Sequence, residues 1–151
     1  MSRYASNTNV SVEKSRTEIE QTLARYGADQ FMYGWDQNRA LLAFRFQSRH
    51  VRFKLELPLR SDFAKTDVRR VARRPEEIEK HWEQACRQRF RALALVIKAK
   101  LEAIDCGISC FDDEFLAFLV LPNGKSVSDW MQPQLTAIYD RGEMPNLLPA
   151  K

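Results

Sequence analysis

The residues with the clearest chemical potential in this sequence form a cluster of arginines near the middle of the chain. Four arginines fall within six residues: Arg69, Arg70, Arg73 and Arg74. A guanidinium group presents a planar fork of donors that can bind phosphate or carboxylate through two hydrogen bonds. The cluster is therefore a candidate site for a polyanion or an acidic protein. A solvated loop, or pairing with acidic residues elsewhere in the chain, would explain the same pattern.

Two further sets of basic residues fall at regular spacing. The polar side of a predicted β-hairpin carries Arg39, Arg45, Arg52 and Lys54, with Arg49 and His50 at or near its turn. One face of a predicted helix carries Lys80, Arg87, Arg91 and Lys98. Either surface can lie along a phosphate backbone. Each is more often an ordinary solvated face, and charges on a strand face also discourage aggregation.

Residues that suit catalysis or metal binding are sparse. His50 and His81 are the two histidines of the chain, and no histidine pair complements Cys106 and Cys110 in a zinc site. Residues 112–114, Asp-Asp-Glu, suit a cation, although an acidic helix start explains them better. The sequence contains no Walker loop, dinucleotide-binding glycine pattern or nucleophile elbow. We expect no catalytic residues, no metal and no cofactor.

Alternation of apolar and polar side chains predicts the sheet that carries the first basic set. Apolar residues occupy the even positions from 40 to 46 and the odd positions from 51 to 59. Such alternation is typical of antiparallel strands with one face in water, and it predicts a hairpin over residues 39–59. Alternating aromatic residues over 31–35 predict a further strand.

Helical spacing of apolar residues predicts helices over residues 12–26 and 76–104, the second of them spanning roughly 40 Å. Ser126 or Ser128 can cap a final helix that ends near Gly142. Residues 60–75 show no period, which predicts an exposed loop or irregular segment. For the apolar run 115–121, the sequence leaves strand and helix equally open.

Together these elements predict one α+β domain over residues 11–142, between a flexible arm (1–10) and a tail (143–151). The expected architecture is an N-terminal helix and an antiparallel meander of about three strands, packed by one long amphipathic helix and a C-terminal helix. A chain of 151 residues is long enough to bury a core. Cys86 and Cys110 are expected to be core thiols.

Charge is distributed unevenly along the chain. The net charge is +4, yet residues 39–100 carry 17 basic and 7 acidic side chains, whereas residues 101–151 carry 3 and 8. The basic middle can attract polyanions or pair with the acidic C-terminal third. The polar start of the chain and its odd number of cysteines, three, predict a cytoplasmic protein with reduced thiols that does not associate with membranes.

Three parts of the sequence resemble small uncharacterised accessory proteins of bacteriophages, prophages and other mobile elements. They are Val10–Arg16, Trp82–Ala103, and the stretch Asp113–Trp130 with its Leu-Pro-Asn-Gly-Lys turn. The resemblance implies a role in DNA metabolism or in inhibiting host defence machinery. It carries over no catalytic residue.

Two hypotheses follow. The first is a non-catalytic protein that binds nucleic acid or a nucleoprotein complex through Arg45, Arg52, Lys54, Arg69, Arg70, Arg73, Arg74, Arg87 and Arg91. The second is a protein–protein inhibitor or adaptor that uses the basic surface or the acidic C-terminal third. A metal-dependent nuclease is a third alternative, and the long helix leaves room for a homodimer. Mutual neutralisation of basic and acidic regions would favour the second hypothesis.

Overall fold

The computed structural model describes residues 5–144. The order of elements confirms the predicted α+β fold. The main elements are α1 (Val12–Arg25), β1 (Gln30–Trp35), β2 (Arg39–Phe46), β3 (Arg49–Glu56), α2 (Pro75–Asp105), α3 (Phe111–Phe115) and α4 (Val127–Arg141). Two short 3-10 helices, η1 (Arg60–Phe63) and η2 (Leu116–Phe118), complete the described part of the chain.

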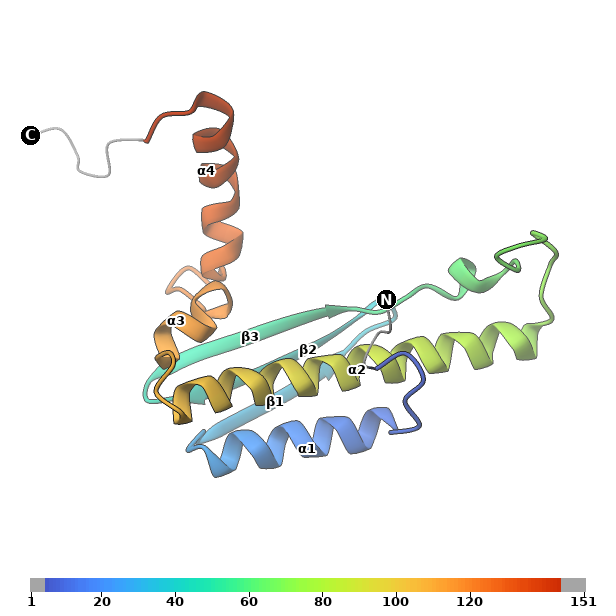
Figure 1. The fold of residues 1–151 in the computed structure, drawn as a ribbon, viewed down its shortest axis with the longest axis horizontal. Coiled ribbons are helices and arrows are strands. Elements are labelled where there is room, and N and C mark those ends of the chain that lie inside the picture. Colours follow the sequence, from blue (N-terminus) through green and yellow to red (C-terminus); the bar gives the residue numbers. More distant parts are fainter. Residues whose placement is uncertain (1–4, 145–151) are drawn as a thin grey trace, which may run out of the picture.

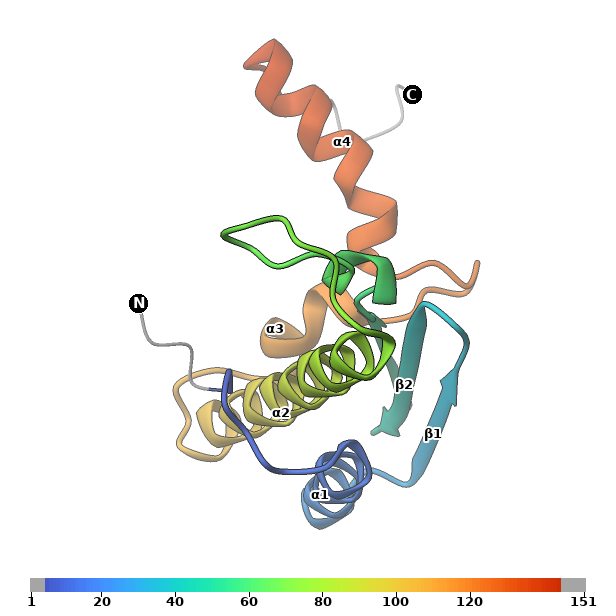
Figure 2. The same ribbon diagram turned by 90° about the vertical axis from the view of Figure 1, so that its right-hand side faces the viewer.

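The three strands form an antiparallel meander in the order β1-β2-β3, as predicted. Helices α1 and α2 lie side by side and cover one face of this sheet (Figures 1 and 2). Phe31, Phe44 and Val51 are in register across the strands, so their side chains share that face. The core between the layers contains Leu42, Phe44, Val51 and Phe53 from the sheet, with Ile19, Leu23, Ile97 and Leu101 from the helices.

Local capping chemistry defines α1. The Ser11 hydroxyl accepts a hydrogen bond from the Lys14 amide, which satisfies one of the free N–H groups of the first turn. The helix ends before Gly27, whose φ of 102° is accessible to glycine and strained for other residues. A Cβ atom there would also lie 3.3 Å from the ring of Phe46, so the turn into β1 needs this glycine.

Part of the segment preceding α1 contacts α2. Residues 1–4 lie outside the described residues, but Ala5 is buried against the body. The Gln84 side-chain amide on α2 donates to the carbonyls of Ser6 and Thr8. These contacts dock residues 5–8 on α2.

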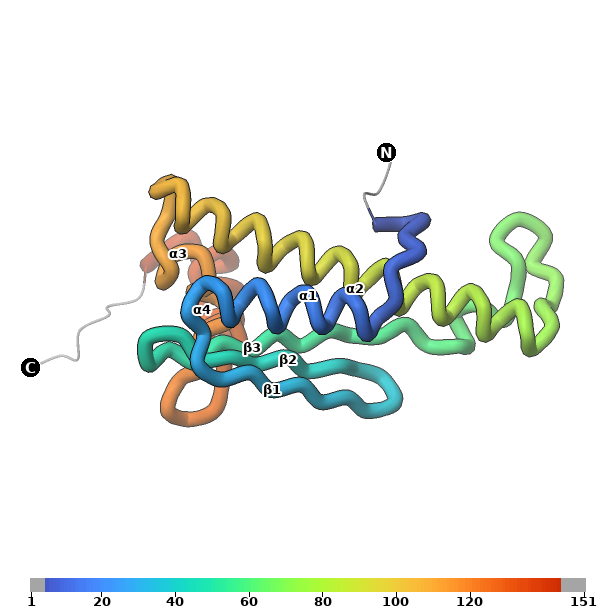
Figure 3. Tube along the Cα trace, turned by 90° about the horizontal axis from the view of Figure 1, so that it is seen from below, coloured from blue at the N-terminus to red at the C-terminus, as the bar shows by residue number. Residues whose placement is uncertain are grey.

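Helix α2 begins at Pro75, which suits the first helical turn because its missing N–H has no partner there. Its buried side chains are Cys86, Phe90, Leu93, Ala94, Ile97 and Leu101. Seen from below, the N-terminal part of α2 extends beyond the end of the sheet (Figure 3). The burial of Cys86 was predicted, whereas Cys110 is exposed because it caps the start of α3 instead of entering the core.

The apolar run 115–121 combines a helical end and an extended segment. Phe115 is fully buried, and its ring centroid lies 5.6 Å from that of Phe44. The chain then becomes extended: Leu119 forms a bridge with Val51, and the Val120 amide donates to the His50 carbonyl. This segment fastens the C-terminal third to the outer edge of β3.

Helix α4 has the predicted caps but not the predicted packing. Its N-cap is Ser126, and Gly142 closes it in the left-handed conformation with a φ of 67°. The helix contacts η2 and stands away from the sheet (Figure 1), and none of its side chains is buried. Within residues 5–144, no helix is both long and apolar enough to cross a membrane.

Candidate nucleic-acid interface

The four clustered arginines lie on a small projecting hairpin that we call the arginine arm, residues 64–74. Its two sides are joined by a bridge between Lys65 and Ala72 and by backbone hydrogen bonds from Thr66 to Val71 and from Arg73 to Ala64, both of 2.9 Å. The arm follows η1 and projects beyond the sheet near the start of α2 (Figure 1). The expected irregular loop is therefore an ordered turn structure.

Two details stabilise the arm. The Arg73 guanidinium donates to the carbonyls of Phe63 and Lys65, at 3.1 and 3.0 Å, and so holds the base of the turn. At the tip, the Thr66 hydroxyl accepts from the Val71 amide, and Arg70 adopts a positive φ of 53°. Arg73 is thus a scaffold residue, and the strained position of Arg70 is part of how the tip reverses.

The other three arginines of the arm present their side chains to solvent. Arg69, Arg70 and Arg74 are exposed, and no carboxylate within residues 5–144 pairs with their guanidinium groups. Only the backbone amide of Arg74 binds a carboxylate, that of Glu77. The arm also carries exposed Lys65, against a single acidic residue, Asp67. The result is a projecting, net positive element whose charges face water.

The base of the arm is anchored to α2. The Arg60 guanidinium makes two hydrogen bonds with the Glu79 carboxylate, of 2.7 and 2.9 Å, which lower the pKa of Glu79 below its usual value. The same guanidinium lies 3.7 Å from the centre of the Trp82 ring. The Trp82 indole N–H donates to the Pro58 carbonyl at 2.7 Å. These contacts fix the direction in which the arm leaves the body.

On the predicted basic face of the sheet, by contrast, the cationic side chains bind other groups of the same chain. Arg45 binds Asp29 through hydrogen bonds of 2.6–3.2 Å, and Lys54 binds Asp129 at 3.1 Å. The Arg52 guanidinium donates to the Gly124 carbonyl at 2.8 Å. The cations of this face therefore have partners, two of them supplied by the C-terminal third.

Arg49, at the turn of the hairpin, is neutralised in the same way. Its guanidinium binds Asp112 with two hydrogen bonds of 3.1 and 3.2 Å. Hydrogen bonds from Arg45, Arg49 and Lys54 lower the pKa values of Asp29, Asp112 and Asp129, respectively. Asp112 and Asp129 of the acidic third thus neutralise Arg49 and Lys54, and Asp29, which precedes β1, neutralises Arg45.

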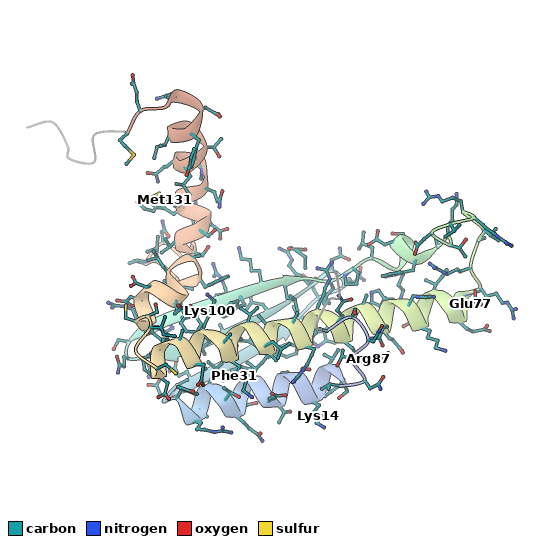
Figure 4. All side chains as sticks on the ribbon, in the orientation of Figure 1. Lys14, Phe31, Glu77, Arg87, Lys100 and Met131 are labelled. Carbon is teal, nitrogen blue, oxygen red and sulfur yellow. The ribbon has the colours of Figure 1, made fainter. Side chains whose placement is uncertain are left out.

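The basic stripe of α2 is also divided by internal contacts. Arg91 pairs with Glu18 of α1, and Arg87 donates to the Gln84 side chain at 2.6 Å. Figure 4 shows Arg87 on α2 near the start of α1, and Lys100 at the opposite end of the helix, near α3. Lys100 is held by Glu114 at 3.5 Å. The stripe is therefore not a continuous free surface.

The nine predicted binding residues consequently fall into separate groups. Among them, Arg69, Arg70 and Arg74 of the arm combine exposure with a guanidinium group that pairs with no carboxylate in the described residues. Sequence reasoning missed Lys65, which joins them through the bridge to Ala72. No periodic pattern in residues 64–74 marks this pairing.

Two of the three acidic residues considered for metal binding serve as ion-pair partners. Asp112 is held by Arg49 and Glu114 by Lys100, at different positions around α3. Among the described residues, no group of three or more His, Cys, Asp or Glu side chains is arranged to hold a metal ion.

Comparison of the chain with protein families, with curated protein sequences and with solved structures finds no match.

Proposed function

We propose that the chain is a non-catalytic accessory protein of the phage type that binds nucleic acid, or a nucleoprotein complex, through the arginine arm. The observation that carries this proposal is the contrast in pairing: the guanidinium groups of Arg69, Arg70 and Arg74 have no carboxylate partner in residues 5–144, whereas the side chains of Arg45, Arg49 and Lys54 each bind one. Free guanidinium groups on a projecting element can displace counterions from a phosphate backbone.

The shape of the arm supports the same function. A two-stranded ribbon fits within the major groove of B-form DNA, and arginines also enter narrow minor grooves. The exposed Val68, with 92% of its surface accessible, lies beside Arg69 at the tip and can contact sugars or base edges. Contacts of this kind are directed mainly at phosphates, so we expect affinity with weak sequence preference.

The test is a salt titration of binding to a fluorescein-labelled duplex of about 20 base pairs, followed by anisotropy. The test variant is Arg69→Ser/Arg70→Ser. The control, Arg25→Ser/Lys98→Ser, removes the same charge from exposed positions on α1 and α2. We expect the test variant to reduce the slope of log affinity against log salt by about 2, since each phosphate contact contributes roughly 0.9. The control should change the slope by less than about half as much.

Two results would contradict the proposal. One is the absence of binding by the unmodified protein at about 50 mM salt, where electrostatic contacts are strongest. The other is an equal effect of the test and control variants, which would indicate a general response to net charge.

A second candidate function is that of a protein–protein inhibitor or adaptor. Two observations favour it: the internal neutralisation of the sheet cations, and helix α4, which exposes Trp130 and Tyr139 and buries no side chain. Exposed aromatic residues are common anchors at protein interfaces. This function predicts no independent affinity for nucleic acid, and Trp130→Ala/Tyr139→Ala should abolish capture of the partner without changing the thermal midpoint.

A further inference from the structure

A groove of about 500 Å³ lies where the start of α1, the end of β1 and the middle of α2 come together. Four aromatic rings line it: Tyr33, Trp35, Trp82 and Phe90. This volume is within the range of sites for small organic groups. The groove lies on the helix-covered side of the sheet, away from the paired cations of the outer face.

The most accessible ring in the groove is that of Trp35. Its neighbour on the same face of β1, Tyr33, meets Phe90 edge-on at a centroid distance of 6.2 Å. Trp35 instead leaves 74% of its surface exposed. An indole in this position offers a flat apolar surface on which another planar group can stack.

Charged groups of both signs surround these rings. Arg16 lies over the Tyr33 ring at 4.8 Å, and Arg87, Glu13 and Glu83 also line the groove. Nucleobase edges carry both hydrogen-bond donors and acceptors, so arginines and carboxylates together can satisfy them. A purely apolar ligand would make no use of these charged groups.

The groove is continuous with the base of the arginine arm. Trp82 lines the groove, donates to the carbonyl of Pro58, and carries the Arg60 guanidinium on its ring. Leu57, just before this point, is also a lining residue. Residues 57–60 therefore link the groove to η1 and to the base of the arginine arm.

We propose that this groove holds one unstacked base of single-stranded nucleic acid, stacked on Trp35, while the flanking phosphates bind the arginine arm. The inference rests on the proposed function and adds the type of strand that is recognised. A base in a duplex is stacked on its neighbours and is not available to Trp35, so the groove should favour single strands.

The experiment compares binding of a labelled 20-nucleotide oligothymidine and a labelled duplex of the same length, in about 50 mM salt. The test variant is Trp35→Ala. Its matched control is Met32→Ala, which truncates another exposed side chain on the opposite face of β1. We expect Trp35→Ala to weaken single-strand binding roughly 5- to 150-fold, the range found for loss of one base–aromatic stack. Duplex binding, and both affinities of Met32→Ala, should change less than about twofold.

A spectroscopic readout separates stacking from a change in fold. Oligothymidine should quench the tryptophan fluorescence of the unmodified protein. In Trp35→Phe, the aromatic ring should restore most of the single-strand affinity while this quenching falls. Arg69→Ser/Arg70→Ser should weaken both single-strand and duplex binding, because the arm is required for each.

The outcomes distinguish the two proposals. Unchanged single-strand affinity in Trp35→Ala, or an equal loss for single strand and duplex, overturns the base-binding groove and leaves the arm intact as a binding site. Absence of binding to either probe by the unmodified protein overturns both.

Discussion

The arginine arm and the outer face of the sheet are two basic regions of one chain with opposite electrostatic states. On the sheet, Arg49 and Lys54 bind Asp112 and Asp129, which come from elements more than 60 residues later in the sequence. On the arm, Arg69 and Arg70 find no such partner among the described residues. The availability of a charge for binding thus depends on where the rest of the chain returns, and not on the local density of arginines.

The ion pairs of the sheet face are exposed, and exposed pairs contribute little to stability individually. Burial is the stronger link between the C-terminal third and the sheet. Phe115 is fully buried against Phe44 and Phe53, at centroid distances of 5.6 and 6.3 Å. This ring positions α3, and α3 in turn positions Asp112 against Arg49.

The largest expected effect therefore comes from Phe115→Ala, which should separate the neutralising acids from the sheet. We expect a loss of about 3–5 kcal/mol in the free energy of unfolding, the usual cost of emptying a buried phenylalanine site. Urea denaturation measures it. The adjacent Leu116→Ala, at a position 51% exposed, is the control and should cost less than about 1 kcal/mol. Equal losses would mean that Phe115 does not join the two regions.

A second prediction removes the neutralising charges without removing the packing. In Asp112→Asn/Asp129→Asn, the cations Arg49 and Lys54 lose their carboxylates and become available to phosphate. Affinity for nucleic acid at about 50 mM salt should rise, with a salt slope steeper by up to about 2. Anisotropy titrations measure both quantities.

The matched control for this variant is Asp113→Asn/Asp140→Asn. It makes the same change in net charge at exposed positions that pair with no cation in the described chain. If both variants increase affinity equally, the released cations have no special role, and the comparison between the two basic regions loses its functional meaning.

The acid stability of the protein should reflect the same ion pairs. Asp29, Asp112 and Asp129 have pKa values lowered from 3.8, chiefly by hydrogen bonds from Arg45, Arg49 and Lys54. Since the folded-state pKa values lie below the unfolded ones, the stability they confer is complete above about pH 4 and is lost as the pH falls through the folded values. Thermal midpoints between about pH 7 and pH 2 should therefore fall less steeply in Asp112→Asn/Asp129→Asn. If the thermal midpoint of this variant falls with pH as steeply as that of the unmodified protein, these pairs do not stabilise the fold.

Elements with a clear period or cap were predictable from the sequence. The alternation over 39–59 predicts β2 and β3, and the apolar stripe over 76–104 predicts α2 to within a residue at each end. Ser126 and Gly142 likewise predict the limits of α4. These features depend on interactions within a few residues, which is why one sequence suffices to identify them.

The candidate site was only partly predictable, because its properties depend on distant contacts. The arginine cluster was evident in the sequence. In the structure, however, the Arg73 side chain binds the carbonyls of Phe63 and Lys65, and the Arg45 side chain binds Asp29. No local sequence pattern distinguishes these residues from Arg69, whose side chain has no carboxylate partner among the described residues. The aromatic groove was missed for a similar reason, since it brings Trp35 and Trp82 together from elements far apart in sequence.

The smallest expected effect tests whether Arg73 has a structural role in the arm that differs from the binding role of the other arginines. Arg73→Lys keeps the positive charge, but an ammonium group lacks the planar fork that reaches the carbonyls of Phe63 and Lys65 together. Loss of one such hydrogen bond is worth about 1 kcal/mol, so amide exchange of Thr66 and Arg73, measured by NMR, should accelerate roughly fivefold. The control is Arg74→Lys, at an exposed position without a carbonyl partner in the described chain, which should leave these rates unchanged.

The thermal midpoint should stay within about 1 °C in both variants, because the arm buries no side chain in the core and its local opening is independent of global unfolding. The salt slope of nucleic-acid binding should also be preserved in Arg73→Lys, since no charge is lost. A reduced slope would mean that Arg73 itself contacts phosphate. In that case Arg73 would both hold the arm together and bind nucleic acid. A hydrogen bond within the protein would then not prevent an arginine of the arm from binding phosphate.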